Sequence, residues 1–261
     1  MKKKLFIYFL TTSLIVGFLA YPRPVEAFSF GSELNWYFVP TKEKGKIPEP
    51  AKESISFLKD CNGYYLGDTS QKTLYLTFDE GYEKGYTSAI LDTLKELEVP
   101  AAFFVVKPYI DNEPDLIRRM VDEGHLVCNH SNHHHSMPSV HNIEKFNSEL
   151  NDVEEAYKSL IGEDMPKFFR PPMGKYSKES LEKTKELGYK TIFWSFAYKD
   201  WFVNDQPSED YAIKKIENGV HPGGIILLHA VSKTNMKVLK TVLTDLKNEG
   251  YEFKSLSELP E

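Results

Sequence analysis

The sequence predicts an α/β fold in which a closed or nearly closed barrel of parallel strands is surrounded by helices. From residue 73 onward, short apolar segments alternate with longer segments of helical character, an alternation that is typical of β/α units. The short segments are apolar almost throughout, which indicates strands that are buried on both faces. Because no Gly-x-Gly-x-x-Gly follows the first of them, an open dinucleotide-binding sheet is the weaker interpretation.

Seven strands and six helices account for this alternation. The strand segments are rich in branched, aromatic or aliphatic residues and are bounded by Gly, Pro or charged residues. We expect strands at residues 73–78, 101–106, 125–129, 167–169, 190–196, 224–229 and 251–256. Several helical segments begin with Ser, Thr, Asp or Asn and end with Gly, as capped helices do. We expect helices at residues 87–98, 115–124, 142–162, 177–188, 209–219 and 234–250.

Residues 1–27 have the layout of a secretory signal peptide. Three lysines precede an apolar run from Leu5 to about Ala20, and a small-x-small sequence ends at Ala27. The alternative is a retained membrane anchor, because the apolar run approaches the ~20 residues that span a bilayer. In both cases we expect the rest of the chain to act outside the cytoplasm.

The mature chain would hold about 234 residues, enough for one large domain with an ample core. Residues 28–70 show no clear period and carry Lys, Pro and Gly around an aromatic cluster. We therefore expect an arm, residues 28–70, packed on a domain that occupies residues 71–261. Cys61 and Cys128 are the only cysteines; export permits one disulfide between them, but Cys128 lies in an apolar run, where a thiol usually behaves as a small buried hydrophobe.

Charge argues against a nucleic-acid partner. Loss of the export segment reduces the basic residues from 32 to 28 and the acidic residues from 38 to 37, so the mature chain carries a net charge of about −9. Binding to nucleic acid depends on Lys and Arg side chains that neutralise phosphates. The sign of the charge therefore favours other partners.

Polar clusters follow five of the predicted strands at their carboxyl ends. In barrels of parallel strands, catalytic residues gather on the loops at this end, so the common placement predicts one active site. The clusters are Asp79-Glu80, NHSNHHH from residue 129, RPPMG from residue 170, AYKDW from residue 197, and His229.

His130 and His134 predict a metal site. They are four residues apart, so in a helical or tight-turn segment both rings can face one cation. Glu80 would add a carboxylate and leave open positions for water and substrate, which is typical of a catalytic site. The neighbouring His133 is the competing partner of His130. Asp79 would then stay free as the general base for a metal-bound water.

Two further ionic pairs are expected at the same end of the barrel. Arg170 lies between an apolar Phe pair and two prolines, and a partly buried guanidinium needs a carboxylate, for which Asp79 is the expected partner. His229 ends a buried strand. A carboxylate beside an imidazole raises its pKa and fixes its orientation, so Asp200 and His229 together form a candidate general acid.

Taken in order, these residues resemble the five motifs of the polysaccharide deacetylases of carbohydrate esterase family 4, the NodB homology domain. The matching segments are TFDEG, HSNHH, RPPMG, AYKDW and LLHAVS, and the resemblance spans roughly residues 70–256. It implies a distorted seven-stranded (β/α) barrel like the TIM barrel. It also implies a divalent metal, usually zinc, and hydrolysis of N-acetyl groups on amino sugars, or of O-acetyl groups in some members.

By position, the resemblance implies that Asp79 is the base and His229 the acid, with Arg170 orienting the first and Asp200 tuning the second. It assigns metal binding to Glu80, His130 and His134.

Three positions depart from the family pattern. Glu80 stands where the family usually has Asp and is one methylene longer. Met173 replaces the usual tyrosine, whose implied role is a backbone N–H donated to the oxyanion, a group that Met also has. Ala197 replaces the first acid of Asp-x-x-Asp-Trp, whereas Trp201, the last residue of that motif, would wall the acetyl pocket.

The segments TFDEGYEKGY and FWSFAYKDW, together with the arm, are most similar to the delta-lactam-biosynthetic branch of spore-forming bacteria. This similarity implies deacetylation of N-acetylmuramic acid in peptide-free peptidoglycan strands, on the way to the muramic δ-lactam of the spore cortex. The implied location is the cell wall or the intermembrane space of the forespore. The alternatives are a deacetylase of peptidoglycan N-acetylglucosamine or chitooligosaccharide, and a non-catalytic glycan-binding protein.

A muramic substrate would need local recognition. Its lactyl ether carries a carboxylate, which a chain near −9 repels unless nearby cations or N–H groups meet it. The candidate cations, each close to a motif, are Lys84, Lys175 and Lys199. The candidate rings for stacking on sugar faces are Tyr82, Tyr86 and Tyr198.

Overall fold

The structure, a computed structural model, describes residues 31–260. The predicted signal peptide, residues 1–27, lies outside the described residues. Within residues 31–260, no helix is both long enough and apolar enough to cross a membrane.

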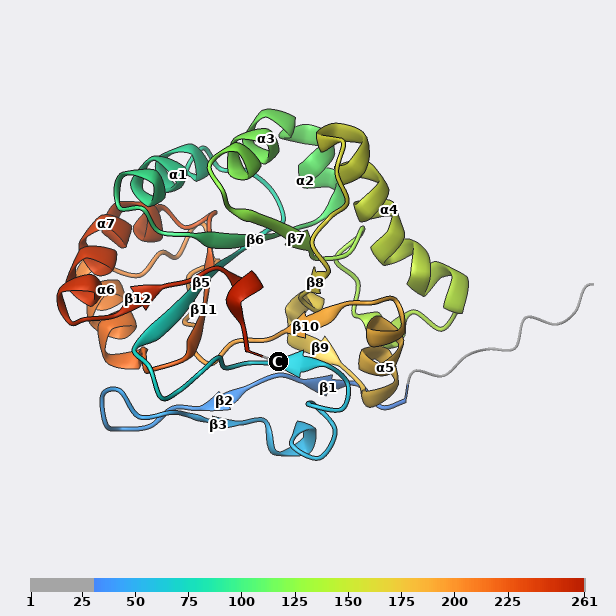
Figure 1. The fold of residues 1–261 in the computed structure, drawn as a ribbon, viewed down its shortest axis with the longest axis horizontal. Helices are drawn as coiled ribbons and strands as arrows, with labels where there is room; N and C mark the ends of the chain where they lie inside the picture. Colours follow the sequence, from blue (N-terminus) through green and yellow to red (C-terminus); the bar gives the residue numbers. More distant parts are fainter. Residues whose placement is uncertain (1–30, 261) are drawn as a thin grey trace, which may run out of the picture.

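A curled sheet of parallel strands forms the centre of the molecule (Figure 1). Its order is β11-β5-β6-β7-β8-β10-β4, and β12 pairs with β5 off this path. A parallel bridge between Phe196 and Ile226 joins the chain beyond β10 to β11, so the sheet curls back on itself. The strands are β4 (Gly63–Tyr64), β5 (Thr73–Glu80), β6 (Ala101–Val105), β7 (Leu126–Asn129), β8 (Phe168–Phe169), β10 (Lys190–Ile192), β11 (Gly224–His229) and β12 (Glu252–Phe253). The predicted α/β barrel is confirmed.

Helices cover the outside of the sheet (Figure 1). They are α1 (Thr87–Glu96), α2 (Lys107–Asn112), α3 (Pro114–Asp122), α4 (Ile143–Ile161), α5 (Lys178–Glu186), α6 (Glu209–Gly219) and α7 (Lys233–Asn248). The side chains of Asn142, Ser177, Ser208 and Ser232 cap four of them by accepting a backbone N–H. The sequence did not predict α2, because its six residues are too few for a helical period to show.

Two apolar layers hold the barrel together. On the helix side, Leu74, Leu76 and Phe78 of β5 pack in one large cluster. On the inner side, Tyr75 belongs to a smaller cluster with Cys128 and residues of neighbouring strands. This alternation follows from the period of two in a β-strand. It also sends Asp79 and Glu80, the two acids of β5, to opposite sides of the sheet. Both Cys61 and Cys128 are buried free thiols.

The arm, coloured blue in Figure 1, runs along one side of the barrel. The indole ring of Trp36 stacks on Phe193 at a centroid distance of 4.3 Å, and its Nε1–H donates to the carbonyl of Trp194 at 2.9 Å. Further along, β4 pairs in parallel with β10, so this segment adds a strand to the sheet. The arm holds three more short strands. β1 (Leu34–Asn35) pairs with β9 (Lys175–Tyr176), and β2 (Phe38–Val39) pairs with β3 (Glu49–Pro50), both antiparallel.

Four short 3-10 helices complete the described chain. They are η1 (Lys52–Ser54), η2 (Met137–Ser139), η3 (Pro172–Gly174) and η4 (Leu256–Glu258).

Candidate active site

The carboxyl ends of the strands open into a cleft of about 1100 Å³. The predicted site residues that line it are Asp79, Tyr82, His130, His134, Met173, Tyr198, Trp201 and His229. Trp36, Tyr37 and Phe38 of the arm also line it. That the arm lines the cleft could not be predicted, because it has no periodic pattern that would place its aromatic residues.

Asp79 points into the barrel and has an ionic partner. It lies in register with His229 on the neighbouring strand β11, so both side chains emerge at the same edge of the sheet. Arg170 Nη1 donates to Asp79 Oδ1 at 2.8 Å, as expected from the sequence. Burial opposes the charged carboxylate, but the charge and hydrogen bond of Arg170 outweigh it and hold the pKa of Asp79 below its ordinary value.

Arg170 is fixed by the packing around it. It is 0% exposed; its Nε donates to the carbonyl of Ile192 at 3.0 Å, and its guanidinium lies 4.1 Å from the ring centroid of Phe104. These contacts leave the planar group little freedom to rotate, so it presents Nη1 to Asp79 in one orientation.

Asp200 and His229 form the second pair. Asp200 Oδ1 lies 2.7 Å from His229 Nδ1, and Oδ2 accepts the backbone N–H of His229 at 2.9 Å. Burial disfavours the imidazolium, but the Asp200 carboxylate outweighs it by charge and hydrogen bond, so the pKa of His229 lies above its ordinary value. With Nδ1 held by the carboxylate, Nε2 is the atom that can carry a proton into the cleft.

Asn235 supports this pair, although no sequence pattern predicts that role. Its Nδ2 donates to Asp200 Oδ2 at 2.6 Å and to the carbonyl of His229 at 3.2 Å, while its Oδ1 accepts the hydroxyl of Tyr198. The residue is buried in the first turn of α7. Only the fold brings this helix end beneath the loop that carries Asp200.

His130 and His134 lie together, as predicted. Their ring centroids are 4.9 Å apart. His130 Nδ1 lies 2.8 Å from the carbonyl oxygen of Arg170, and its Nε2 lies 3.6 Å from Asp79 Oδ2. Burial lowers the pKa of His130 to about 4 and also lowers that of His134. Both imidazoles are therefore neutral near pH 7, which is the form that binds metal.

His133 and His134 turn in different directions. His133 Nδ1 lies 2.7 Å from Glu149 Oε1, and its backbone N–H donates to Glu149 Oε2 at 2.9 Å. Its ring therefore turns toward α4, whereas His134 stays beside His130. A positive φ of 57° at His134 accompanies this reversal of direction between adjacent side chains.

Glu80 is not where the sequence analysis expected it. The predicted strand stopped at Phe78, but β5 continues through Glu80, so the alternation of the strand sends the Glu80 side chain to the helix side, opposite to Asp79. There it is 0% exposed, and Thr87 Oγ1 lies 3.5 Å from its Oε1. Burial, reinforced by the nearby Glu83 carboxylate, raises the pKa of Glu80 well above its ordinary value. The structure does not bring Glu80 to the two imidazoles.

The donor set that does face the cleft fits a divalent ion. It consists of two neutral imidazoles, His130 and His134, and the ionised carboxylate of Asp79, a combination that suits zinc and similar ions. Metal-binding histidines usually donate the ring N–H that does not face the metal to a carbonyl or carboxylate. The contact of His130 Nδ1 with the Arg170 carbonyl is of this kind. The three ligand atoms do not all lie within 4.8 Å of one another, so side-chain rotation would accompany binding.

The predicted substrate-binding residues differ in exposure. Trp201 is 45% exposed, and its ring centroid lies 5.5 Å from that of His229, so it forms a wall beside the acid. Met173 has a φ of 57°, a strained conformation that is common at functional sites. Tyr82 is exposed at the mouth. Tyr198 is only 6% exposed; its hydroxyl is engaged inside the protein, so it is not the open stacking surface that was expected.

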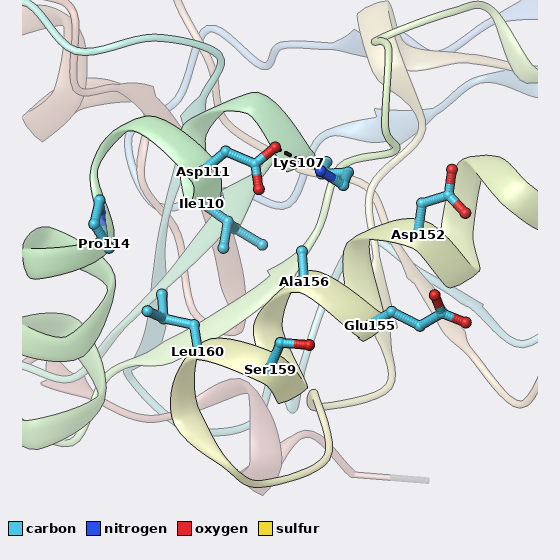
Figure 2. A pocket seen from close by; sticks show the side chains of 9 residues that line it. All are labelled: Lys107, Ile110, Asp111, Pro114, Asp152, Glu155, Ala156, Ser159 and Leu160. Atoms are coloured by element: carbon cyan, nitrogen blue, oxygen red, sulfur yellow. Dashed lines mark hydrogen bonds and ion pairs between the residues drawn. The ribbon is translucent and has the colours of Figure 1, made fainter.

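A second pocket, of about 500 Å³, lies between α2 and α4, away from this chemistry (Figure 2). Its one ion pair joins Lys107 to Asp111 within α2. The acids of α4 at its edge are Asp152 and Glu155. None of the predicted site residues lines it.

A comparison with known proteins identifies the family of this chain. Residues 66–192 match the family model described as polysaccharide deacetylase. The chain is 41% identical, over 87% of its length and 85% of the relative, to the peptidoglycan-N-acetylmuramic acid deacetylase PdaA of Bacillus subtilis. This chain belongs to the polysaccharide deacetylase family. It is therefore an enzyme of that family, whose deacetylases depend on a metal.

Other relatives extend the comparison. The polysaccharide deacetylase chain is 47% identical, over 81% of its length and 80% of the relative, to an uncharacterised 30.6 kDa protein of Geobacillus stearothermophilus. The solved structure of B. subtilis PdaA, a family 4 carbohydrate esterase, matches with a TM-score of 0.83 at 41% identity, covering 87% of this chain and 96% of that one. A family 4 carbohydrate esterase from Bacillus anthracis matches with a TM-score of 0.73 at 42% identity, covering 87% and 96%.

Proposed function

We propose that this deacetylase hydrolyses the N-acetyl group of N-acetylmuramic acid in peptidoglycan strands that lack their peptides. The observation that carries the proposal is the cleft in which a carboxylate held by Arg170 faces an imidazole held by Asp200, in a chain 41% identical to PdaA over most of both lengths. A paired base and acid serve hydrolysis, whereas a glycan-binding protein has no use for them.

The two pairs supply the proton transfers of amide hydrolysis. Asp79, whose Oδ1 is occupied by Arg170, accepts through Oδ2 the proton of the water that attacks the acetyl carbonyl carbon. His229 Nε2 then gives its proton to the amide nitrogen as the C–N bond breaks, which releases acetate and the free amine. Arg170 and Asp200 act through these residues, the first by orienting the base and the second by keeping the acid protonated.

The metal belongs to the same cleft. We propose that His130 and His134 hold it while Asp79 remains the free base beside it, and that the ion is zinc, which imidazole nitrogens suit. When bound, such an ion polarises a carbonyl group and lowers the pKa of a water molecule.

Lys199 is the cation best placed to recognise the lactyl carboxylate. Of the three lysines singled out, it alone lines the cleft. Its ammonium lies 3.8 Å from an exposed carboxylate, Asp205, a separation that competes weakly with a substrate anion. Lys175 is engaged by Glu33 at 2.7 Å. Lys84 and Lys199 both lie over aromatic rings, of Tyr82 and Phe202, so the lining of the cleft is what distinguishes Lys199.

The place of action is part of the proposal. Residues 1–27 have the pattern of an export signal, and a peptidoglycan substrate lies outside the cytoplasm. We therefore propose an exported enzyme that acts in the cell wall or in the intermembrane space of the forespore, on the route to muramic δ-lactam. Amino-terminal sequencing of the protein recovered outside the cytoplasm tests this; an amino terminus that retains residues 1–27 would favour the membrane anchor.

The substrate is tested by a direct comparison. The same zinc-loaded enzyme is given peptide-free N-acetylmuramoyl glycan and chitooligosaccharide, and released acetate is measured. We expect faster release from the muramoyl glycan. Equal or faster release from chitooligosaccharide would remove the muramic assignment and leave a deacetylase of N-acetylglucosamine. Binding of both glycans without any acetate would instead indicate a non-catalytic glycan-binding protein.

A further inference from the structure

A compact group of three side chains lies on the rim of the cleft, apart from His130 and His134. Its members are His133, His135 and Glu149. Their ligand atoms all lie within 4.8 Å of one another, and no other group of three His, Cys, Asp or Glu side chains in residues 31–260 does so. We propose that these three residues bind a second divalent transition-metal ion.

The donor atoms converge on one point. His133 Nδ1 lies 2.7 Å and His135 Nδ1 3.5 Å from the same atom, Oε1 of Glu149. Metal–ligand bonds of 2.0–2.1 Å in a tetrahedron place ligand atoms about 3.3 Å apart. The His135 separation already matches this value. The His133 separation must lengthen by about 0.6 Å, which an exposed imidazole achieves by a small rotation.

Charge supports the same conclusion. The Glu149 side chain is only 8% exposed, and its ion-pair partners within the described chain are His133 and His135, with no lysine or arginine. A buried carboxylate needs a compensating positive charge. A divalent cation held by the two imidazoles supplies that charge directly beside Oε1.

The arrangement of the rings also fits a shared cation. The imidazoles of His133 and His135 are stacked with a centroid distance of 5.4 Å and an interplanar angle of 16°. Two rings in this arrangement can each present a ring nitrogen to one ion. Both rings are more than half exposed, so an ion can enter from solvent.

The chemistry of the set selects the class of ion. Two nitrogen donors and one carboxylate favour zinc and its neighbours over calcium or magnesium, which prefer oxygen ligands. Three protein ligands leave a further position open, as in metal sites that exchange ligands. Because His133 and His135 also line the cleft, that position is available to water or to an oxygen ligand bound there.

The proposal is tested by counting ions. Metal-free protein is equilibrated with excess zinc, and bound zinc per chain is measured by elemental analysis. We expect two ions in the wild type, one in the His133→Ala/His135→Ala double variant, and one in the His130→Ala/His134→Ala double variant. His141→Ala, a change at an exposed histidine outside the group, is the matched control and should leave two.

Zinc binding at this rim site is independent of catalysis. If the cleft site bound no metal, the wild type would hold one ion and the His133→Ala/His135→Ala variant none, which still supports the rim site. Equal numbers of ions in these two proteins would overturn the proposal. Should the variant fail to fold, anomalous scattering at the zinc edge from wild-type crystals decides: a peak between the two rings is expected, and its absence refutes the site.

Discussion

Replacement of Asp200 by Asn should lower the pKa of His229 while leaving the shape of the cleft unchanged. The Asp200 carboxylate is 1% exposed and accepts from His229 twice, at 2.7 and 2.9 Å. Asparagine keeps nearly the same size but lacks the charge. In its absence, the burial that already opposes the imidazolium is no longer offset, so the pKa of His229 should fall.

The size of the effect follows from the interaction that is lost. A hydrogen bond to a charged group contributes about 1.5–3 kcal/mol, and a shift of one pKa unit corresponds to about 1.4 kcal/mol. The pKa of His229 should therefore fall by roughly one to two units. A general acid must be protonated to act, so activity is present below its pKa and lost above it. The alkaline limb of kcat/KM should move to lower pH by the same amount, with about 10- to 100-fold less activity on that side.

The assay is acetate release from peptide-free muramoyl glycan, followed across a pH series for the wild type and Asp200→Asn. Asp60→Asn makes the same chemical change at an exposed carboxylate and should leave the profile unchanged. A merely structural role of Asp200 would lower the rate without moving the limb. An Asp200→Asn enzyme with the wild-type rate and the wild-type limb would refute the reasoning.

Three further outcomes are expected. Asp79→Asn should abolish acetate release but retain glycan binding in equilibrium measurements, because it removes the proton acceptor and keeps the shape; wild-type turnover would exclude Asp79 as the base. Lys199→Ala should raise KM for muramoyl glycan by about 2- to 5-fold, the usual value of one exposed ionic contact, and leave KM for chitooligosaccharide unchanged, with Lys84→Ala as the control; equal losses on both glycans would argue against carboxylate recognition. The metal-free protein should lose stability as pH falls from 6.5 toward 4, because His130 stays neutral in the fold to about pH 4 and takes up its proton more readily when unfolded. The full loss from this residue is about 3 kcal/mol, and thermal unfolding at several pH values measures it; a flat profile would contradict the burial of a neutral imidazole.

Most of the barrel and the two ionic pairs could be predicted from the sequence. The parallel strands are nearly continuous apolar runs, and their polar ends fall on one edge, so Asp79, Arg170, Asp200 and His229 were correctly expected to meet. The placement of Glu80 was wrong because it depends on where β5 ends. Once the strand extends by two residues, its period of two separates neighbours that the sequence presents as a pair.

Contacts between segments that are distant in the chain could not be predicted from local sequence patterns. Asn235 occupies an ordinary first helical turn, and nothing nearby in the chain marks it as the support of Asp200. Trp36 lies in an irregular arm, where no hydrophobic period indicates a direction. In both cases the partner is fixed by tertiary packing between segments more than 30 residues apart.

The arm lines the cleft but supplies none of the residues of the two ionic pairs. Trp36, Tyr37 and Phe38 line the cleft, yet they precede residue 66, where the match to the family model begins. The cleft is therefore built from two separate stretches of the chain, since the arm supplies these three aromatic residues and the barrel supplies the two ionic pairs. Substitutions at Trp36, Tyr37 or Phe38 can therefore reshape the cleft without replacing any residue of the two ionic pairs.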